Sequence, residues 1–211
     1  MSRIMFTFLK LSSLSQSGLL LRLLAAVCLV GAVTSCAPAP SRTPDVFYDL
    51  SVQPVGQTYG STASLSIASI SAQGVMSGRP FVTQTSTDPV AYAELRGHLW
   101  HIPPSQLLQS ALVDGLSAGS ADLQIGTSDT LTSPDYRLKL KLRQFSFTPN
   151  GEAVIALDAV IKSRQAEILK TATYSARQPV AGDTAEAAVR AYQDAVQQIA
   201  EQLSADIAEL F

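Results

Sequence analysis

The residues of this chain best suited to acid–base chemistry or metal binding are its two histidines, His98 and His101. If they lie on a strand, their spacing of three places the two side chains on opposite faces. No cysteine and no group of acids stands beside them, although a zinc site needs three or four ligands and a serine nucleophile needs a neighbouring base. The H-E-x-x-H, P-loop and G-x-G-x-x-G patterns are absent. We therefore expect no enzyme, no metal site and no bound cofactor.

Cys36 is the residue best suited to covalent modification. The residues before it are Val33-Thr34-Ser35, at the end of an apolar run of 11 residues at 23–33. This length suits the core of a signal peptide, about 7–15 residues, and falls short of the roughly 20 residues that span a bilayer. Small residues before a cysteine at the end of such a core resemble a bacterial lipobox. The resemblance implies that the chain is cut before Cys36 and that the sulfur of Cys36 carries lipid.

The charges around the apolar run also favour a signal peptide. Its basic residues are Arg3, Lys10 and Arg22. Residues 1–35 contain no acid, and we predict that they form a lipoprotein signal peptide. The alternatives are a plain secretory signal or an uncleaved anchor, with Cys36 incidental. Ala37 stands where lipoproteins retained in the inner membrane usually have Asp, so the resemblance to sorted lipoproteins implies the periplasmic face of the outer membrane.

Residues 36–45 are predicted to form a short tether. Its prolines are Pro38, Pro40 and Pro44. Prolines favour an extended chain, and nine residues span at most roughly 30 Å. We expect the rest of the chain, one domain at 46–211, to stay close to the membrane to which the lipid attaches it.

Removal of the signal peptide changes the length, the net charge and the cysteine content of the chain. The 176 remaining residues suffice for one domain with a real core. The formal charge changes from −2 to −5, because three basic residues are lost while all 17 acids remain; nucleic acid is therefore not an expected ligand. Cys28 leaves with the signal peptide and Cys36 carries lipid, so we expect a domain without disulfides that is stabilised by packing alone.

Four basic residues recur at every second position, and we call them the basic row: Arg137, Lys139, Lys141 and Arg143. The positions between them hold Tyr136, Leu138, Leu140 and Leu142. This alternation predicts a strand with one apolar and one basic face. The apolar phase changes near Gln144, because Phe145 and Phe147 fall in step with the basic row, and a bulge would reconcile the two. The row is either a solvated strand face or a cationic stripe that binds phosphate head groups or an acidic partner.

Trp100 is the only tryptophan of the chain, and it stands shortly before the paired prolines Pro103 and Pro104. It is either an anchor of the core or an exposed interface residue. In the second case it is a candidate for a partner-binding hot spot.

Alternating patterns and aromatic or β-branched residues predict extended segments around these candidates. They lie at 46–50, 63–70, 79–85, 92–98, 122–126, 136–147, 153–162 and 167–176. The segment at 79–85 is expected to be a short edge strand. Asn150-Gly151 predicts a hairpin between the two longest segments, and the third long segment completes a meander.

Two helices are predicted. The first, at 105–118, follows the paired prolines and stops before Gly119. The second has about 25 residues and begins near Asp183, which with Glu186 resembles a capping box. Its apolar stripe comprises Val189, Tyr192, Val196, Ile199, Leu203, Ile207 and Leu210. The predicted fold is α+β, an antiparallel sheet with two helices packed on one face, or a two-layer sandwich.

The order of these features resembles the family of ABC-type transport auxiliary lipoproteins. The similar stretches are Tyr48-Asp49-Leu50, residues 99–108 (LWHIPPSQLL), residues 136–140 with Phe145, and the closing alanine-rich helix. Together they cover most of the mature chain. The family usually has Arg directly before the tryptophan, whereas Leu99 occupies that place here.

The resemblance implies a periplasmic accessory subunit without catalytic activity, whose partners are an MCE-domain protein and an inner-membrane permease. We predict a lipid-anchored, non-enzymatic subunit of an ABC/MCE-type lipid transport system that docks the complex at the outer membrane. The alternative is a periplasmic lipid carrier with an apolar acyl cavity. A closed core favours docking, and a deep apolar pocket of roughly several hundred Å³ favours carrying. The transported lipid and any self-association stay open.

Overall fold

Strand β6 (Tyr136–Phe147) connects the parts of an eight-stranded sheet. Along one edge it pairs antiparallel with β7 (Glu152–Ser163), which pairs in turn with β8 (Ile168–Pro179). Its other edge is shared, because β2 (Ala63–Ile67) pairs near its start and β3 (Pro80–Thr87) at its end. The strand with the basic row is therefore central to the sheet.

The remaining strands extend the sheet beyond β2 and β3. β5 (Leu123–Thr127) pairs with β2, whereas β4 (Val90–Trp100) pairs with β3 and β1 (Val46–Tyr48) with β4. The long pairings are antiparallel, as predicted, but β1/β4, β2/β5, β2/β6 and β3/β6 are parallel. The prediction of an edge strand at 79–85 is wrong, because β3 lies between β4 and β6.

The computed structural model describes residues 44–59, 62–87, 90–120 and 122–210. They belong to one unit of the chain, Pro44–Phe211. The predicted signal peptide, Cys36 and all of the tether before Pro44 lie outside the described residues. Among those described, no helix is long and apolar enough to cross a membrane.

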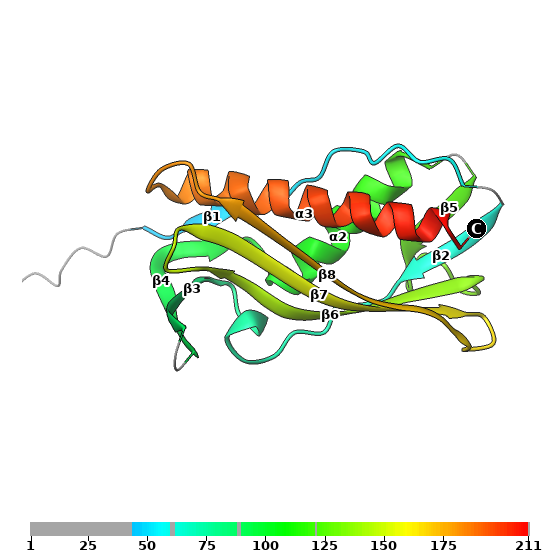
Figure 1. Ribbon diagram of the computed structural model, residues 1–211, viewed down its shortest axis with the longest axis horizontal. Coiled ribbons are helices and arrows are strands. Elements are labelled where there is room, and N and C mark those ends of the chain that lie inside the picture. The colour runs from blue at the N-terminus through cyan, green and yellow to red at the C-terminus, as the bar shows by residue number, and fades with distance from the viewer. Residues whose placement is uncertain (1–43, 60–61, 88–89, 121, 211) are drawn as a thin grey trace, which may run out of the picture. The chain divides into compact units, whose positions relative to one another are not determined.

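Two α-helices pack on one face of the sheet (Figure 1). Helix α3 (Ala185–Ala208) contacts β7 and β8, α2 (Pro104–Ala118) contacts β5, and the two helices contact each other. A short 3₁₀ helix, η1 (Gly74–Ser77), lies near β6. The α+β prediction with both helices on one face is confirmed.

The core lies between the helices and the sheet. Leu138, Leu140 and Leu142 of β6 are buried, whereas the basic residues between them are exposed. All but the last residue of the predicted apolar stripe of α3 are buried. The alternation of β6 and the helical spacing of α3 therefore direct their apolar sides to one interior.

Two irregularities of β6 lie where the sequence predicts them. The β6–β7 pairing shifts register between Leu142 and Gln144, so Arg143 is the extra residue of a bulge. This bulge brings Phe145 back to the buried face. The hairpin turn contains Gly151 with a φ of +76°, a conformation that glycine adopts readily.

The N-terminal cap of α3 differs from the predicted one. Thr184 is the cap, and its hydroxyl accepts a hydrogen bond from the backbone N–H of Ala187. The prediction of Asp183 as the cap is wrong by one residue. A threonine fulfils the same role, because its side-chain oxygen satisfies a helix N–H that has no partner within the helix.

The connection between β1 and β2 runs across the helices (Figure 1). The backbone N–H of Val55 donates to the carbonyl of Gly115 in α2 at 2.8 Å, and that of Gln53 donates to the side chain of Gln197 in α3. Farther along, the hydroxyls of Tyr59 and Ser204 share a buried hydrogen bond at 3.0 Å. The chain that follows the predicted anchor thus holds both helices on the sheet.

Candidate functional site

The basic row lies on the face of the sheet that the helices leave open. All four side chains are exposed, and the three leucines between them face the core. The sequence therefore predicted the strand and its two faces correctly. Whether the row binds a ligand stays a prediction.

One member of the basic row is neutralised within the sheet. Arg143 forms an ion pair with Asp158 of β7 at 2.8 Å. The hydrogen bond from Arg143, and after it one from Thr173, outweigh desolvation and hold the pKa of Asp158 below its ordinary value. Arg137, Lys139 and Lys141 form no ion pair with a described acid. Lys141 lies opposite Asp158 on β7, and its charge also helps to lower the pKa of Asp158, so Arg137 and Lys139 are the members of the row without an acid opposite them.

Trp100 is 1 % exposed and belongs to an aromatic cluster in the core. Its ring stacks on Phe81 at a centroid distance of 4.2 Å and meets Phe145 and Tyr192 edge-on at 5.3 and 5.4 Å. A side chain buried to this extent offers a partner no surface. Trp100 is therefore a core anchor, the first of the two predicted alternatives, and not part of a binding surface.

The two histidines have different surroundings. His101 is exposed just beyond β4, whereas the Nδ1 atom of His98 is 3.2 Å from the hydroxyl of Tyr48. The same hydroxyl donates to Glu186 at the start of α3 at 3.3 Å. This contact joins residues far apart in sequence, and sequence reasoning missed it. No three His, Cys, Asp or Glu residues of the described chain are grouped so that they could hold a metal.

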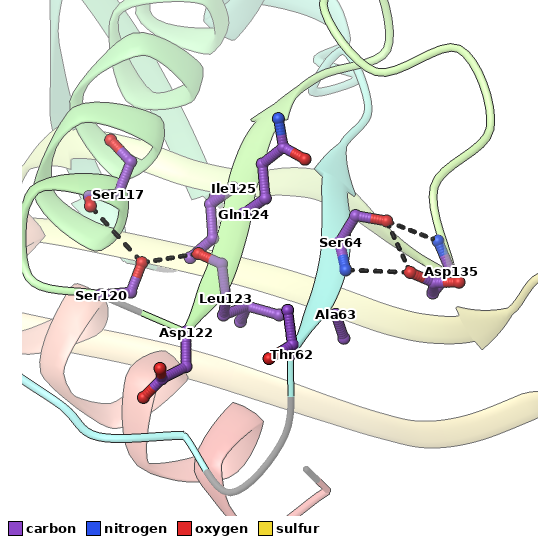
Figure 2. Close-up of a pocket in the computed structure, with 10 residues that line it drawn as sticks. All are labelled: Thr62, Ala63, Ser64, Ser117, Ser120, Asp122, Leu123, Gln124, Ile125 and Asp135. Atoms are coloured by element: carbon purple, nitrogen blue, oxygen red, sulfur yellow. Dashed lines mark hydrogen bonds between the residues drawn. The ribbon is translucent and has the colours of Figure 1, made fainter.

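Figure 2 shows an open pocket of about 550 Å³ at the ends of β2 and β5 beside the C-terminus of α2. Its lining is largely polar and comprises Thr62, Ala63, Ser64, Ser117, Ser120, Asp122, Leu123, Gln124, Ile125 and Asp135. A second pocket, of about 370 Å³, is lined by Ser69, Ile70, Ile102, Ser105, Gln106, Gln109 and Ser110. Neither is the deep apolar cavity that an acyl chain requires.

Asp135, the most strongly bonded residue of this pocket, has a structural role. Its carboxylate accepts hydrogen bonds from the hydroxyl and the backbone N–H of Ser64 at 2.7 and 3.0 Å (Figure 2). Arg164 donates to its other oxygen at 2.7 Å. The two bonds from Ser64, more than the charge of Arg164, hold the pKa of Asp135 below its ordinary value. Asp135 thus fixes the start of β6 to β2 and is not free to act as a base.

Residues 115–119 form a G-x-S-x-G pattern, which sequence reasoning wrongly took to be absent. Such a pattern is catalytic where the serine sits on a sharp turn between a strand and a helix. Ser117 instead lies in the last turn of α2, where its hydroxyl donates to the carbonyl of Asp114. The two glycines allow the connection from β1 to approach the helix, because a Cβ on Gly119 would lie 1.8 Å from the carbonyl oxygen of Val55. The pattern is a packing contact.

The model of a known family matches most of the chain described above. This is the ABC-type transport auxiliary lipoprotein component, and the match covers residues 48–204. The chain belongs to this family. The matched region extends from the last residue of β1 into the last turns of α3, so it includes both layers of the fold. Membership makes the chain an auxiliary component of an ABC-type transport system, in a family of lipoproteins.

The solved structures similar to this family member include two that share most of its fold. The crystal structure of protein XCC0632 from Xanthomonas campestris is 18 % identical, with 78 % of this chain and 95 % of that chain covered and a TM-score of 0.66. That of an uncharacterised protein is 22 % identical, with 80 % of this chain and 99 % of that chain covered and a TM-score of 0.62. At these identities the likeness concerns the fold. No curated protein matches the chain.

Proposed function

We propose that the chain is a lipid-anchored, non-enzymatic accessory subunit of an ABC/MCE-type lipid transport system. It docks this system at the periplasmic face of the outer membrane. The observation that carries the proposal is the match to the auxiliary lipoprotein family, which begins at residue 48, only twelve residues after Cys36. A lipid on Cys36 would hold the matched domain at a membrane surface, because the intervening chain is short.

The interior of the domain supports docking over lipid carrying. Its core is filled by large side chains from both layers, among them Trp100, Phe145 and Tyr192. The two pockets described above are lined mainly by polar residues. A carrier needs an apolar cavity for an acyl chain, whereas a docking subunit needs only its surface.

The proposed partners are an MCE-domain protein and an inner-membrane permease of the same system. The family match supports an association with a transport system, and these two partners are part of the proposal. The surfaces open to them include the β3–β4 hairpin, where Val90 and Tyr92 are 60 % and 38 % exposed. Exposed apolar side chains of this kind suit protein contacts.

Purification from cross-linked membranes tests the proposal. The full chain, tagged after α3, is expected to recover the ABC permease and the MCE-domain protein. The control is Cys36→Ala, which should leave the fold intact and remove the protein from the outer-membrane fraction. Recovery of neither partner with the lipidated protein would contradict the proposal.

A further inference from the structure

Two basic residues lie opposite each other on the face of the sheet that the helices do not cover. Arg137 of β6 lies directly opposite Lys162 of β7, and directly opposed residues of antiparallel strands share a face. Lys139 and Lys141 follow on the same face of β6. We call these four residues the cation cluster, and none of them forms an ion pair with a described acid. Like charges directly opposite each other destabilise a sheet, so the arrangement favours an anionic ligand.

The basic residues of the chain are concentrated in this region. Residues 136–179 contain eight Lys and Arg but three Asp and Glu, although the whole chain has a formal charge of −2. Two of these three acids are engaged, because Asp158 pairs with Arg143 and Glu152 pairs with Arg177. One of the eight basic residues, Lys170, lies on the helix side and pairs with Asp206, and the remaining seven still outnumber the acids.

Exposed apolar side chains border the cation cluster. Ile168 of β8 pairs with Lys162 and is 59 % exposed, and Leu169 beside it is 37 % exposed. Neither of the two pockets described above contains a member of the cluster. Basic residues beside exposed apolar ones are typical of surfaces that rest on anionic membranes.

From this geometry we infer that the cation cluster and Ile168 rest on an anionic phospholipid surface. The inference depends on the lipid anchor of the proposed function. The anchor keeps the domain within roughly 30 Å of the lipid, so weak contacts suffice to orient it, as in other tethered pairs. The contact turns the helices away from the membrane and toward the partners.

A fluorescent label on the open face tests this orientation. In the lipidated protein Cys36 is blocked, so the cysteine of Thr171→Cys is the free thiol for an environment-sensitive dye. Thr171 pairs with Val160, which pairs with Lys139, and it is exposed. The matched control is Gln202→Cys, an exposed position of α3 on the helical side.

The labelled proteins are reconstituted into phosphatidylglycerol or phosphatidylcholine vesicles. Dye at Thr171→Cys is expected to brighten and shift to the blue on phosphatidylglycerol alone, and dye at Gln202→Cys is expected not to change. The signal should disappear in about 1 M salt, where the screening length is about 3 Å. Because a Lys or Arg near an anionic surface contributes about fivefold in partitioning, Lys139→Gln should weaken the signal about fivefold. Arg177→Gln, whose side chain pairs with Glu152, should change it little.

Two results would overturn the inference. One is an equal signal on both kinds of vesicle, and the other is a signal that appears only when the purified permease and MCE-domain protein are added, which would make the face a protein-docking surface. In both cases the protein still sediments with the vesicles through its anchor, so the proposed function stands. Loss of sedimentation itself would contradict the proposed function instead.

Discussion

Asp206 shows how one carboxylate fixes helix α3 to the edge of the sheet. The hydroxyl of Tyr174 in β8 donates to it at 2.6 Å, and Lys170 of the same strand pairs with its other oxygen at 2.9 Å. Burial alone would raise the pKa of Asp206, but these two bonds and the ammonium charge outweigh burial and lower it. Burial first, and then Asp206, raise the pKa of Tyr174, which therefore keeps its proton and donates. Lys170 also reaches Glu209, near the end of the chain.

Neutralising Asp206 is expected to destabilise the domain and to flatten its response to acid. A carboxylate with a lowered pKa stabilises the fold above the pKa of the unfolded chain, about 3.9, and this contribution disappears as the pH falls through the folded pKa. Hydrogen bonds to a charged group contribute about 1.5–3 kcal/mol, so Asp206→Asn should lower the free energy of unfolding by about 2 kcal/mol at pH 7. Urea unfolding at pH 7 and pH 3 measures both effects.

The control for this variant is Asp194→Asn. Asp194 is exposed on the same helix, so its neutralisation should change the free energy of unfolding by less than about 0.5 kcal/mol. Equal losses in the two variants, or an undiminished pH dependence in Asp206→Asn, would show that Asp206 does not fix the helix.

Elements whose pattern is local could be predicted from the sequence. The alternation of β6, the Asn150-Gly151 turn and the spacing of α3 each lie within one continuous stretch, and each is confirmed. The parallel pairings of β2 and the interior place of β3 could not be predicted, because they depend on which distant strand meets β6. The cap of α3 was misplaced because Asp183 and Thr184 are both good caps and stand side by side.

The bulge in β6 predicts an asymmetry between two deletions. Removal of Arg143 should leave a regular pairing, since Leu142 and Gln144 already face Leu157 and Ala156, which are consecutive on β7. Removal of Lys139 should turn Leu140 and Leu142 to the open face, because a shift of one residue exchanges the faces of a strand. Thermal unfolding followed by the fluorescence of Trp100 compares the two proteins.

The deletion of Arg143 is expected to lower the stability only slightly, because the ion pair that it removes, with Asp158, is exposed to solvent. The deletion of Lys139 should prevent cooperative folding, because burial of each leucine contributes about 2 kcal/mol. Equal destabilisation by the two deletions would contradict the assignment of Arg143 as the extra residue of the bulge.

The contact between α2 and the connection from β1 predicts a second asymmetry. In Gly119→Ala the new methyl group would lie 1.8 Å from the carbonyl oxygen of Val55, so the backbone must move. The expected loss is about 1–3 kcal/mol in the free energy of unfolding. Gly56→Ala is the matched control, because no atom lies within 4 Å of its added methyl group. Denaturant midpoints that are equal for the two variants would contradict the contact.

At the scale of the whole molecule, three of the four residues of the cation cluster could be predicted from the sequence as parts of a single strand face. The basic row follows from local alternation, whereas the position of Lys162 opposite Arg137 depends on the β6–β7 register. The contact of Tyr48 with Glu186 likewise joins the first strand to the last helix. Trp100 was left open between two roles, because its burial depends on Phe81, Phe145 and Tyr192 from three other elements.

A lipid on Cys36 is proposed to hold this auxiliary transport domain at a membrane. Intact-mass spectrometry of the protein purified from membranes tests this claim most directly. The predicted result is a chain that begins at Cys36 and carries a diacylglyceryl group on sulfur together with an acyl group on nitrogen. A chain with an unmodified Cys36, or one that still contains residues 1–35, would contradict it.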